Sequence, residues 1–132
     1  MSHIATYTAS LGQVNQDLLK QALEIVAQKL GGQVTDSIQD YYGKNIRDWD
    51  GSAILHGIKT PNVKRGIGVS MKNGILQFVG DGYGYESKFR ELRSEIELTY
   101  KKLALAKALK ESGYDFEVAA NAVGTIFQGR RR

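Results

Sequence analysis

The sequence contains no cysteine and only one proline, one tryptophan and two histidines among its 132 residues. Without cysteine the chain can form no disulfide bond, no thiolate metal site and no cysteine nucleophile. The two histidines, His3 and His56, stand far apart, and their spacing gives no support to a site that joins them with Asp81. We therefore predict neither a metal site nor a cofactor.

A calcium loop is a metal motif that the sequence resembles only in part. Asp48-Trp49-Asp50-Gly51 resembles the middle of such a loop. However, the first ligand position falls on Ile46, and the closing position, which requires glutamate, falls on Gly57. Neither residue has a side-chain oxygen, so we reject this interpretation.

Long apolar runs are missing as well, since none approaches the roughly 20 residues of a membrane-spanning helix. The first ten residues also lack the basic and apolar segments of a signal peptide. We therefore expect a soluble, cytoplasmic protein without a membrane partner. The length, the 42% hydrophobic residues and the 24% charged residues are typical of one globular domain, which we assign to residues 1–132 with a short basic tail at 129–132.

The net charge of +4 comes largely from the last three residues, Arg130, Arg131 and Arg132. Without them 15 basic residues remain against 14 acidic ones, so the rest of the chain is nearly neutral. A basic tail of this kind is either a solvated terminus or an arm that binds an acidic partner such as nucleic acid. The composition leaves both interpretations open.

A β-hairpin is the clearest local signal in the chain, and it forms the centre of the predicted fold. The apolar runs 67–71 and 75–79 flank Asn73-Gly74, a dipeptide typical of the type I′ turn, in which both central residues have positive φ. By alternation, Leu76 and Phe78 face away from Val79. We expect this hairpin to lie in the middle of an antiparallel sheet.

Two helices are predicted from apolar residues at helical spacing. The first covers residues 16–30, with Asn15 or Ser10 as its N-cap and Gly31 at its end. The second covers residues 86–112 and has acidic residues in its first half and lysines in its second, including a Glu86/Arg90 pair. Three leucines beside its apolar stripe either widen the core face or form a docking face: Leu98, Leu105 and Leu109.

Five further strands complete the expected fold. They cover residues 4–9, a short stretch within 33–42 that precedes a polar loop at 43–51, then 52–59, 114–119 and 125–129. This order predicts the α+β class, with a single antiparallel sheet and two helices packed on one face. A ferredoxin-like core with extra strands is one way to connect these elements.

Short motifs along the chain resemble a family of small proteins of cyanobacteria and plastids. They occur in the matching order: Met1-Ser2-His3-Ile4, Asn45-Ile46-Arg47, Gly66-Ile67-Gly68-Val69, Asn73-Gly74, Phe78-Val79-Gly80-Asp81, Gly113-Tyr114 and Gly124-Thr125-Ile126. The family is known as the hypothetical chloroplast open reading frame thirty-five, a domain of unknown function. The sequence departs from it at residues 82–86, which replace a tryptophan-containing segment, and in its longer second helix. The resemblance implies a small cytoplasmic or plastid-type accessory protein whose partner is an ATPase of the AAA+ type.

The glycine-rich segment 80–84 lies where the hairpin ends and the second helix begins, a context that suits a phosphate site. It lacks the glycine spacing of such sites, no Lys-Ser or Lys-Thr pair follows, and Asp81 and Glu86 would repel an anion. We interpret it as a turn in which Asp81 accepts hydrogen bonds from turn amides. Because no serine stands in a nucleophile motif, a small enzyme of unknown reaction is only our third hypothesis.

Our leading hypothesis is a non-catalytic accessory protein that acts by binding another protein. Self-association, in which the partner is a second copy of the chain, is one form of this hypothesis. Large or charged residues in glycine-rich loops are the expected contacts: Arg47, Trp49, Asp81, Tyr83 and Tyr85. The alternative is a single-stranded nucleic-acid-binding module that uses a basic stretch without acidic residues and the tail: Lys59, Lys64, Arg65, Lys72, Arg130, Arg131 and Arg132. A solvated hairpin edge explains the same basic stretch equally well.

Overall fold

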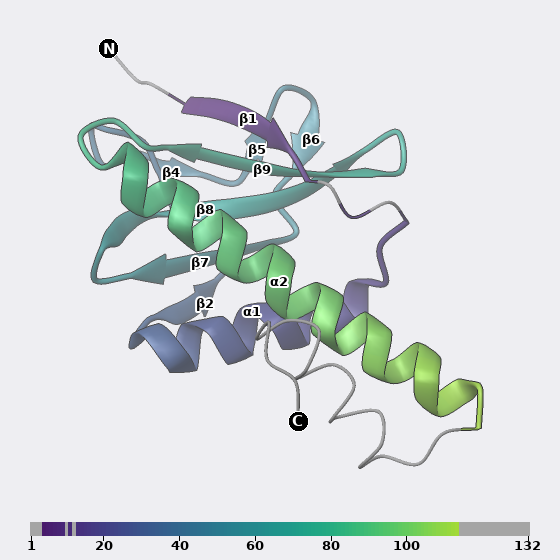
Figure 1. Cartoon of the computed structure of the whole chain (residues 1–132). Coiled ribbons are helices and arrows are strands. Elements are labelled where there is room, and N and C mark those ends of the chain that lie inside the picture. Colours follow the sequence, from purple (N-terminus) through teal and green to yellow (C-terminus); the bar gives the residue numbers. More distant parts are fainter. Residues whose placement is uncertain (1–3, 10, 12, 114–132) are drawn as a thin grey trace.

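The computed structural model describes residues 4–9, 11 and 13–113 (Figure 1). It contains two helices and a five-stranded antiparallel sheet, which confirms the predicted α+β class. The strands expected at 114–119 and 125–129 and the three terminal arginines lie outside the described residues.

The strands of the large sheet follow the order β1 (Ile4–Thr8), β9 (Ile75–Asp81), β8 (Val63–Lys72), β7 (His56–Thr60) and β2 (Gln33–Thr35). Because each neighbouring pair is antiparallel, β1 and β2 run in the same direction at opposite edges. A ferredoxin-like unit places one strand between two such parallel strands, whereas three strands lie between them here. The ferredoxin-like connection is therefore wrong for this part of the chain.

The β8–β9 hairpin forms as the sequence predicts. Asn73 and Gly74 have φ angles of 54° and 79°, the positive values that a type I′ turn requires. Leu76 and Phe78 belong to the core under the helices, while Val79 belongs to a second core on the opposite face. The hairpin is longer than predicted, because β8 begins at Val63.

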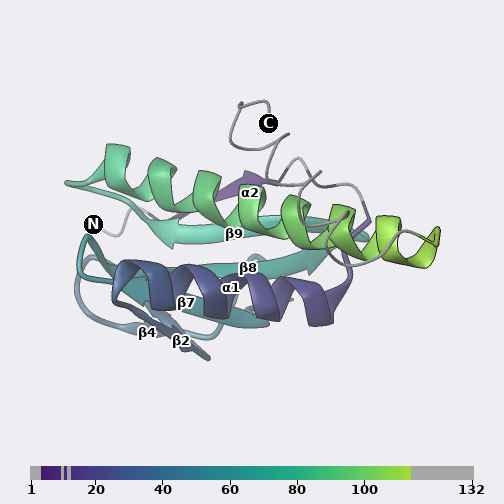
Figure 2. The same cartoon turned by 60° about the horizontal axis from the view of Figure 1, so that its bottom comes forward.

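Helices α1 (Gln16–Leu30) and α2 (Glu86–Glu111) cover one face of the sheet, as predicted. Helix α2 crosses the sheet diagonally and extends past it (Figure 1), and α1 lies beside α2 on the same face (Figure 2). Asn15 caps α1 by accepting a hydrogen bond from the Leu18 amide at 3.1 Å, and Gly31 ends the helix with a φ of 71°.

The opposite face of the sheet is covered by an excursion of the chain between β2 and β7. It contains four two-residue strands: β3 (Ile38–Gln39), β4 (Asn45–Ile46), β5 (Asp48–Trp49) and β6 (Ser52–Ala53). Ile38 and Ile54 of this excursion are buried against Val79. The predicted polar loop at 43–51 is therefore partly strand, and the predicted strand at 52–59 is broken where Ile54 turns towards this second core.

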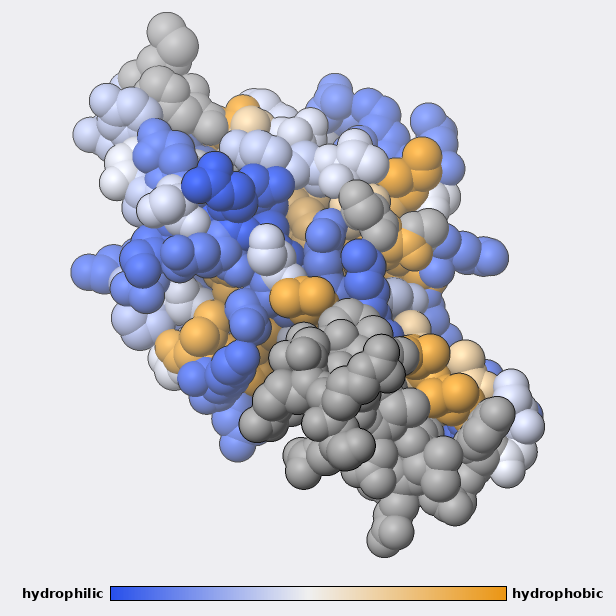
Figure 3. All heavy atoms as spheres, viewed as in Figure 1, coloured by the Kyte–Doolittle hydropathy of each residue, from blue (hydrophilic) through white to orange (hydrophobic). Residues whose placement is uncertain are grey.

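The three extra leucines of α2 differ in exposure, since Leu105 and Leu109 are half-buried and Leu98 is exposed. Leu98 is 44% exposed, so it does not widen the core face. Figure 3 shows a mostly hydrophilic face with hydrophobic side chains in several separate patches. In the part of the chain that the structure describes, no helix is long and apolar enough to cross a membrane.

The side chain of Phe89 in α2 packs directly on β9 because β9 has a glycine beneath the ring. A Cβ atom at Gly80 would lie 2.7 Å from both Cε2 and Cζ of Phe89, whose side chain is buried. No real Cβ atom has such a short contact, so a side chain at position 80 would force the ring or the helix to move.

We expect Gly80→Ala to lower the free energy of unfolding by about 1–3 kcal/mol through overpacking. In a Phe89→Leu background the same substitution should cost less, because leucine lacks the two ring atoms that clash. Equilibrium urea unfolding of the two single variants and the double variant measures this coupling. Strictly additive changes would contradict the proposed contact.

Candidate partner-binding site

A buried carboxylate at the end of β9 joins two turns that are distant in the sequence. Asp81 is fully buried. Its Oδ2 accepts a hydrogen bond from the Tyr41 amide at 2.8 Å, and its Oδ1 accepts one from the Tyr83 amide at 3.2 Å. The expectation that Asp81 bonds turn amides is therefore confirmed, and one of the two amides comes from the excursion that covers the sheet.

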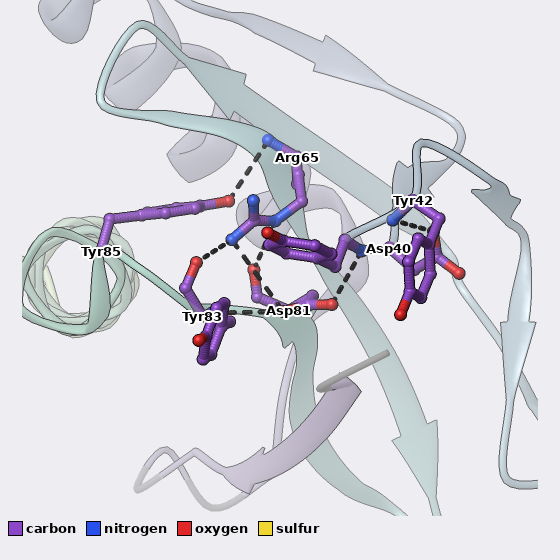
Figure 4. A network of polar contacts seen from close by, with 7 residues as sticks. Asp40, Tyr42, Arg65, Asp81, Tyr83 and Tyr85 are labelled. Carbon is purple, nitrogen blue, oxygen red and sulfur yellow. Dashed lines mark hydrogen bonds and ion pairs between the residues drawn. The ribbon is translucent and has the colours of Figure 1, made fainter. Parts of the chain in front are cut away.

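A second buried carboxylate, Asp40, shapes the turn that carries Tyr41 and Tyr42. Its Oδ1 accepts hydrogen bonds from the amides of Tyr42 and Lys44, each at 2.9 Å (Figure 4). Gly43 completes the turn with a φ of 82°, a conformation that favours glycine. The backbone of both tyrosines is thus fixed by buried acceptors.

Arg65 of β8 contacts Asp81 and the two tyrosines that follow it, Tyr83 and Tyr85. Figure 4 shows it between Tyr85 and Asp81. Its Nε donates a hydrogen bond to the Asp81 carbonyl at 3.1 Å, its Nη2 donates one to the Tyr83 carbonyl, and Nη2 lies 3.9 Å from Asp81 Oδ1. The guanidinium also lies 4.4 Å from the centroid of the Tyr85 ring and 5.5 Å from that of Tyr41.

Three exposed tyrosines lie above this buried framework, and we call Tyr41, Tyr42 and Tyr83 the tyrosine cluster. The Tyr41 ring meets the Tyr42 and Tyr83 rings edge-on. The ring centroids lie 5.4 Å apart for Tyr41 and Tyr42 and 5.3 Å apart for Tyr41 and Tyr83. Their exposed fractions are 47%, 66% and 49%, respectively. A contiguous group of exposed aromatic side chains is typical of a protein-binding surface, where tyrosine is enriched.

Tyr85 marks the border between the site and the helix-side core. It is half-buried, and its hydroxyl accepts a hydrogen bond from the Arg65 amide at 3.3 Å. Burial raises the pKa of this hydroxyl above the ordinary value of a tyrosine, and the positive charge of Arg65 opposes that shift only in part.

The structure divides the five predicted partner contacts into two groups. Tyr83 and Tyr85 lie together at the end of β9, but Asp81 is buried there, so the prediction that it contacts a partner directly is wrong. Arg47 and Trp49 lie on the excursion, where Arg47 forms a 3.1 Å ion pair with Asp36. They do not join the tyrosine cluster.

The position of Trp49 relative to the tyrosine cluster follows from the neighbouring Asp50. Asp50 forms an ion pair with Lys72, in which Lys72 Nζ lies 2.8 Å from Asp50 Oδ2. This contact lowers the pKa of the Asp50 carboxyl. Lys72 stands seven residues after Arg65 on the same strand, about 23 Å away at the usual rise of a β-strand. The excursion hairpin that carries Trp49 therefore lies at the far end of β8.

The predicted nucleic-acid contacts do not form one basic patch among the described residues. Arg65 is engaged with Asp81 and with two carbonyls. Lys64 and Lys72 lie near opposite ends of β8, and Lys59 belongs to β7. The terminal arginines 130–132 lie outside the described residues.

Asp40, Tyr41 and Tyr42 were not among the site residues predicted from the sequence. The two tyrosines were predicted to lie in a short strand, but Asp40-Tyr41-Tyr42-Gly43 is a turn sequence, with an aspartate that can bond the amide two residues later and a glycine for positive φ. That signal could have located the turn. Its contact with Asp81 depends on tertiary structure, which no local pattern reveals.

Comparisons with known proteins add no family to this description. No protein-family model, no curated protein and no solved structure matches the chain. Within residues 4–9, 11 and 13–113, no three His, Cys, Asp or Glu side chains gather in a way that could hold a metal ion.

We expect Asp81→Asn to lower the free energy of unfolding by about 2–4 kcal/mol, because an amide nitrogen would face a backbone N–H and Arg65 would lose its counter-charge. The matched control is Asp36→Asn, because the Asp36 carboxylate is 78% exposed in its ion pair with Arg47. This substitution should lower the free energy of unfolding by less than about 1 kcal/mol. Equilibrium denaturant unfolding measures both variants. Equal losses would show that Asp81 has no special structural role.

The raised pKa of Tyr85 predicts how stability changes at high pH. The folded state keeps a proton that the unfolded chain loses, so Tyr85 contributes a fall in the free energy of unfolding from about pH 10 upwards, until its folded-state pKa is passed. Subtracting the spectrophotometric titration curve of Tyr85→Phe from that of the unmodified protein isolates the ionisation of Tyr85. The difference curve should show a tyrosine whose pKa lies above the ordinary value of this residue. A midpoint at or below that value would contradict the prediction.

Proposed function

We propose that this chain is a non-catalytic accessory protein that binds another protein through the tyrosine cluster. The observation that carries the proposal is the combination of three exposed, mutually contacting tyrosines with a buried framework that fixes their backbone. Tyrosine is enriched among the residues that dominate binding energy at protein interfaces, since it offers a large apolar area and a hydroxyl.

Preorganisation of the cluster strengthens this proposal. Ordering a side chain on binding costs about 0.5–1.5 kcal/mol for each residue immobilised. The amides of Tyr41, Tyr42 and Tyr83 already bond buried carboxylates, so little backbone order remains to be gained when a partner binds. A rigid aromatic surface of this kind supports tighter binding than the same residues on a mobile loop.

A protein partner is favoured over nucleic acid because of the charges near the cluster. A nucleic-acid surface needs several basic side chains along one track. Arg65, the basic residue under the cluster, is bound to Asp81 and is mostly buried, while Lys72 is paired with Asp50. Nucleic-acid binding remains the alternative hypothesis.

The identity of the partner is supported only by the family resemblance, which suggests an ATPase of the AAA+ type. A second copy of the chain is also a protein partner that the cluster could bind. Localisation in the cytoplasm stays a prediction from the sequence.

The test is affinity capture with the tagged full chain from extract of its native cells, with and without nuclease. We expect a stoichiometric protein partner that survives nuclease and is reduced at least tenfold by Tyr42→Ser, because Tyr42 is the most exposed member of the cluster. The matched control is Trp49→Ser, which removes an exposed aromatic side chain elsewhere and should leave capture unchanged.

Each other outcome of the capture experiment points to a different conclusion. Partners that disappear with nuclease would favour the nucleic-acid alternative. A partner that Tyr42→Ser retains and Trp49→Ser loses would move the site to the excursion hairpin. Sedimentation of the purified chain tests self-association, which Tyr42→Ser should weaken if the partner is a second copy.

A further inference from the structure

A pocket that shares Tyr83 with the tyrosine cluster lies where the start of α2 meets β1. Its volume is about 360 Å³, within the range of small-molecule sites. The lining residues come from β1, from the turn after β9 and from three turns of the helix: Tyr7, Gly82, Tyr83, Glu86, Phe89, Arg90 and Arg93. The pocket thus combines aromatic walls with two guanidinium groups.

Arg93 is held in place by aromatic rings and not by an acid. Its guanidinium lies 3.9 Å from the centroid of the Tyr7 ring and 5.7 Å from that of Phe89. Among the described residues, its buried Nε atom has no hydrogen-bond partner. A guanidinium carries five N–H donors, and because Nε is buried, the Nη donors are the ones left for a ligand in the pocket that accepts hydrogen bonds.

Arg90 lies one turn before Arg93 on the same helix and lines the same pocket. The sequence predicts an ion pair between Glu86 and Arg90, but the structure does not contain it, so that prediction is wrong. Within the described part of the chain, neither Arg90 nor Arg93 donates a hydrogen bond or forms an ion pair. The two positive charges at the pocket therefore have no acidic partner among the described residues.

We propose that this pocket binds a small aromatic carboxylate, with the carboxylate between Arg90 and Arg93 and the ring against the aromatic wall. Planar guanidinium groups match the two oxygens of a carboxylate, and the rings of Tyr7 and Tyr83 in the lining favour an aromatic body. Glu86 is the acidic residue in the lining, so the charged residues there sum to +1. That balance suits a ligand with a single negative charge.

This site does not depend on the proposed protein-binding function. Tyr83 belongs to both surfaces, but the two arginines that define the pocket make no contact with the buried framework around Asp81. Failure of the capture experiment would leave the pocket unaffected, and failure of ligand binding would leave the tyrosine cluster unaffected.

The experiment is an NMR titration of the isotope-labelled full chain with benzoate, acetate and benzyl alcohol. Benzoate should cause saturable shifts at the amides of Gly82, Glu86 and Arg93. Acetate has the charge without the ring and benzyl alcohol has the ring without the charge, so each should bind at least tenfold more weakly. Benzoate shifts that do not saturate, or that centre elsewhere on the protein, would overturn the proposal.

Matched variants separate the site from a general effect of charge. Arg93→Gln should weaken benzoate binding at least tenfold, whereas Lys101→Gln removes one positive charge from an exposed position further along α2 and should change it less than twofold. If Arg93→Gln does not fold, Arg90→Gln provides the same test, because the exposed Arg90 has no ion pair with another described residue. Equal effects of the arginine and lysine variants would overturn the proposal.

Discussion

The carboxylate of Asp81 is fully buried, and a buried charge is stable only when other groups replace the water that it has lost. Among the described residues, such groups include the Tyr41 amide in the excursion, the Tyr83 amide in the turn before α2, and the guanidinium of Arg65 on β8. Any displacement of one part would leave a buried donor or acceptor without its partner. The arrangement of both faces of the sheet at this end therefore depends on one side chain.

Elements with local determinants could be predicted from the sequence. The turn at Asn73-Gly74 requires positive φ at two adjacent residues, and this dipeptide supplies it at low cost. Helix α1 was located by its apolar stripe, its Asn15 cap and its final Gly31, all of which lie within or beside the helix. The α+β class followed from these pieces, because a half-apolar sheet needs helices to cover it.

The excursion between β2 and β7 could not be predicted in the same way. Strands of two residues show no alternation, so β3 to β6 left no periodic pattern in the sequence. Ile54 belongs to a core that exists only once Ile38 and Val79 meet it from other elements. The tyrosine cluster has the same dependence, since Tyr41 and Asp81 lie 40 residues apart. For the five predicted contacts, residue type and loop location were consistent with the exposed position of Tyr83 but could not reveal that Asp81 is buried.

The pairing of β1 with β9 has a consequence for how the chain folds. The register joins Ile4 to Asp81, which is 77 residues later in the chain (81 − 4), while β8 and β9 are joined through a two-residue turn. A hairpin closes within microseconds, whereas a contact across so many residues must first overcome the entropy of closing a long loop. We therefore expect the edge strand to add to a hairpin that has already formed. Because Asp81 is the residue that Ile4 pairs with, the addition of β1 places a strand beside the buried carboxylate.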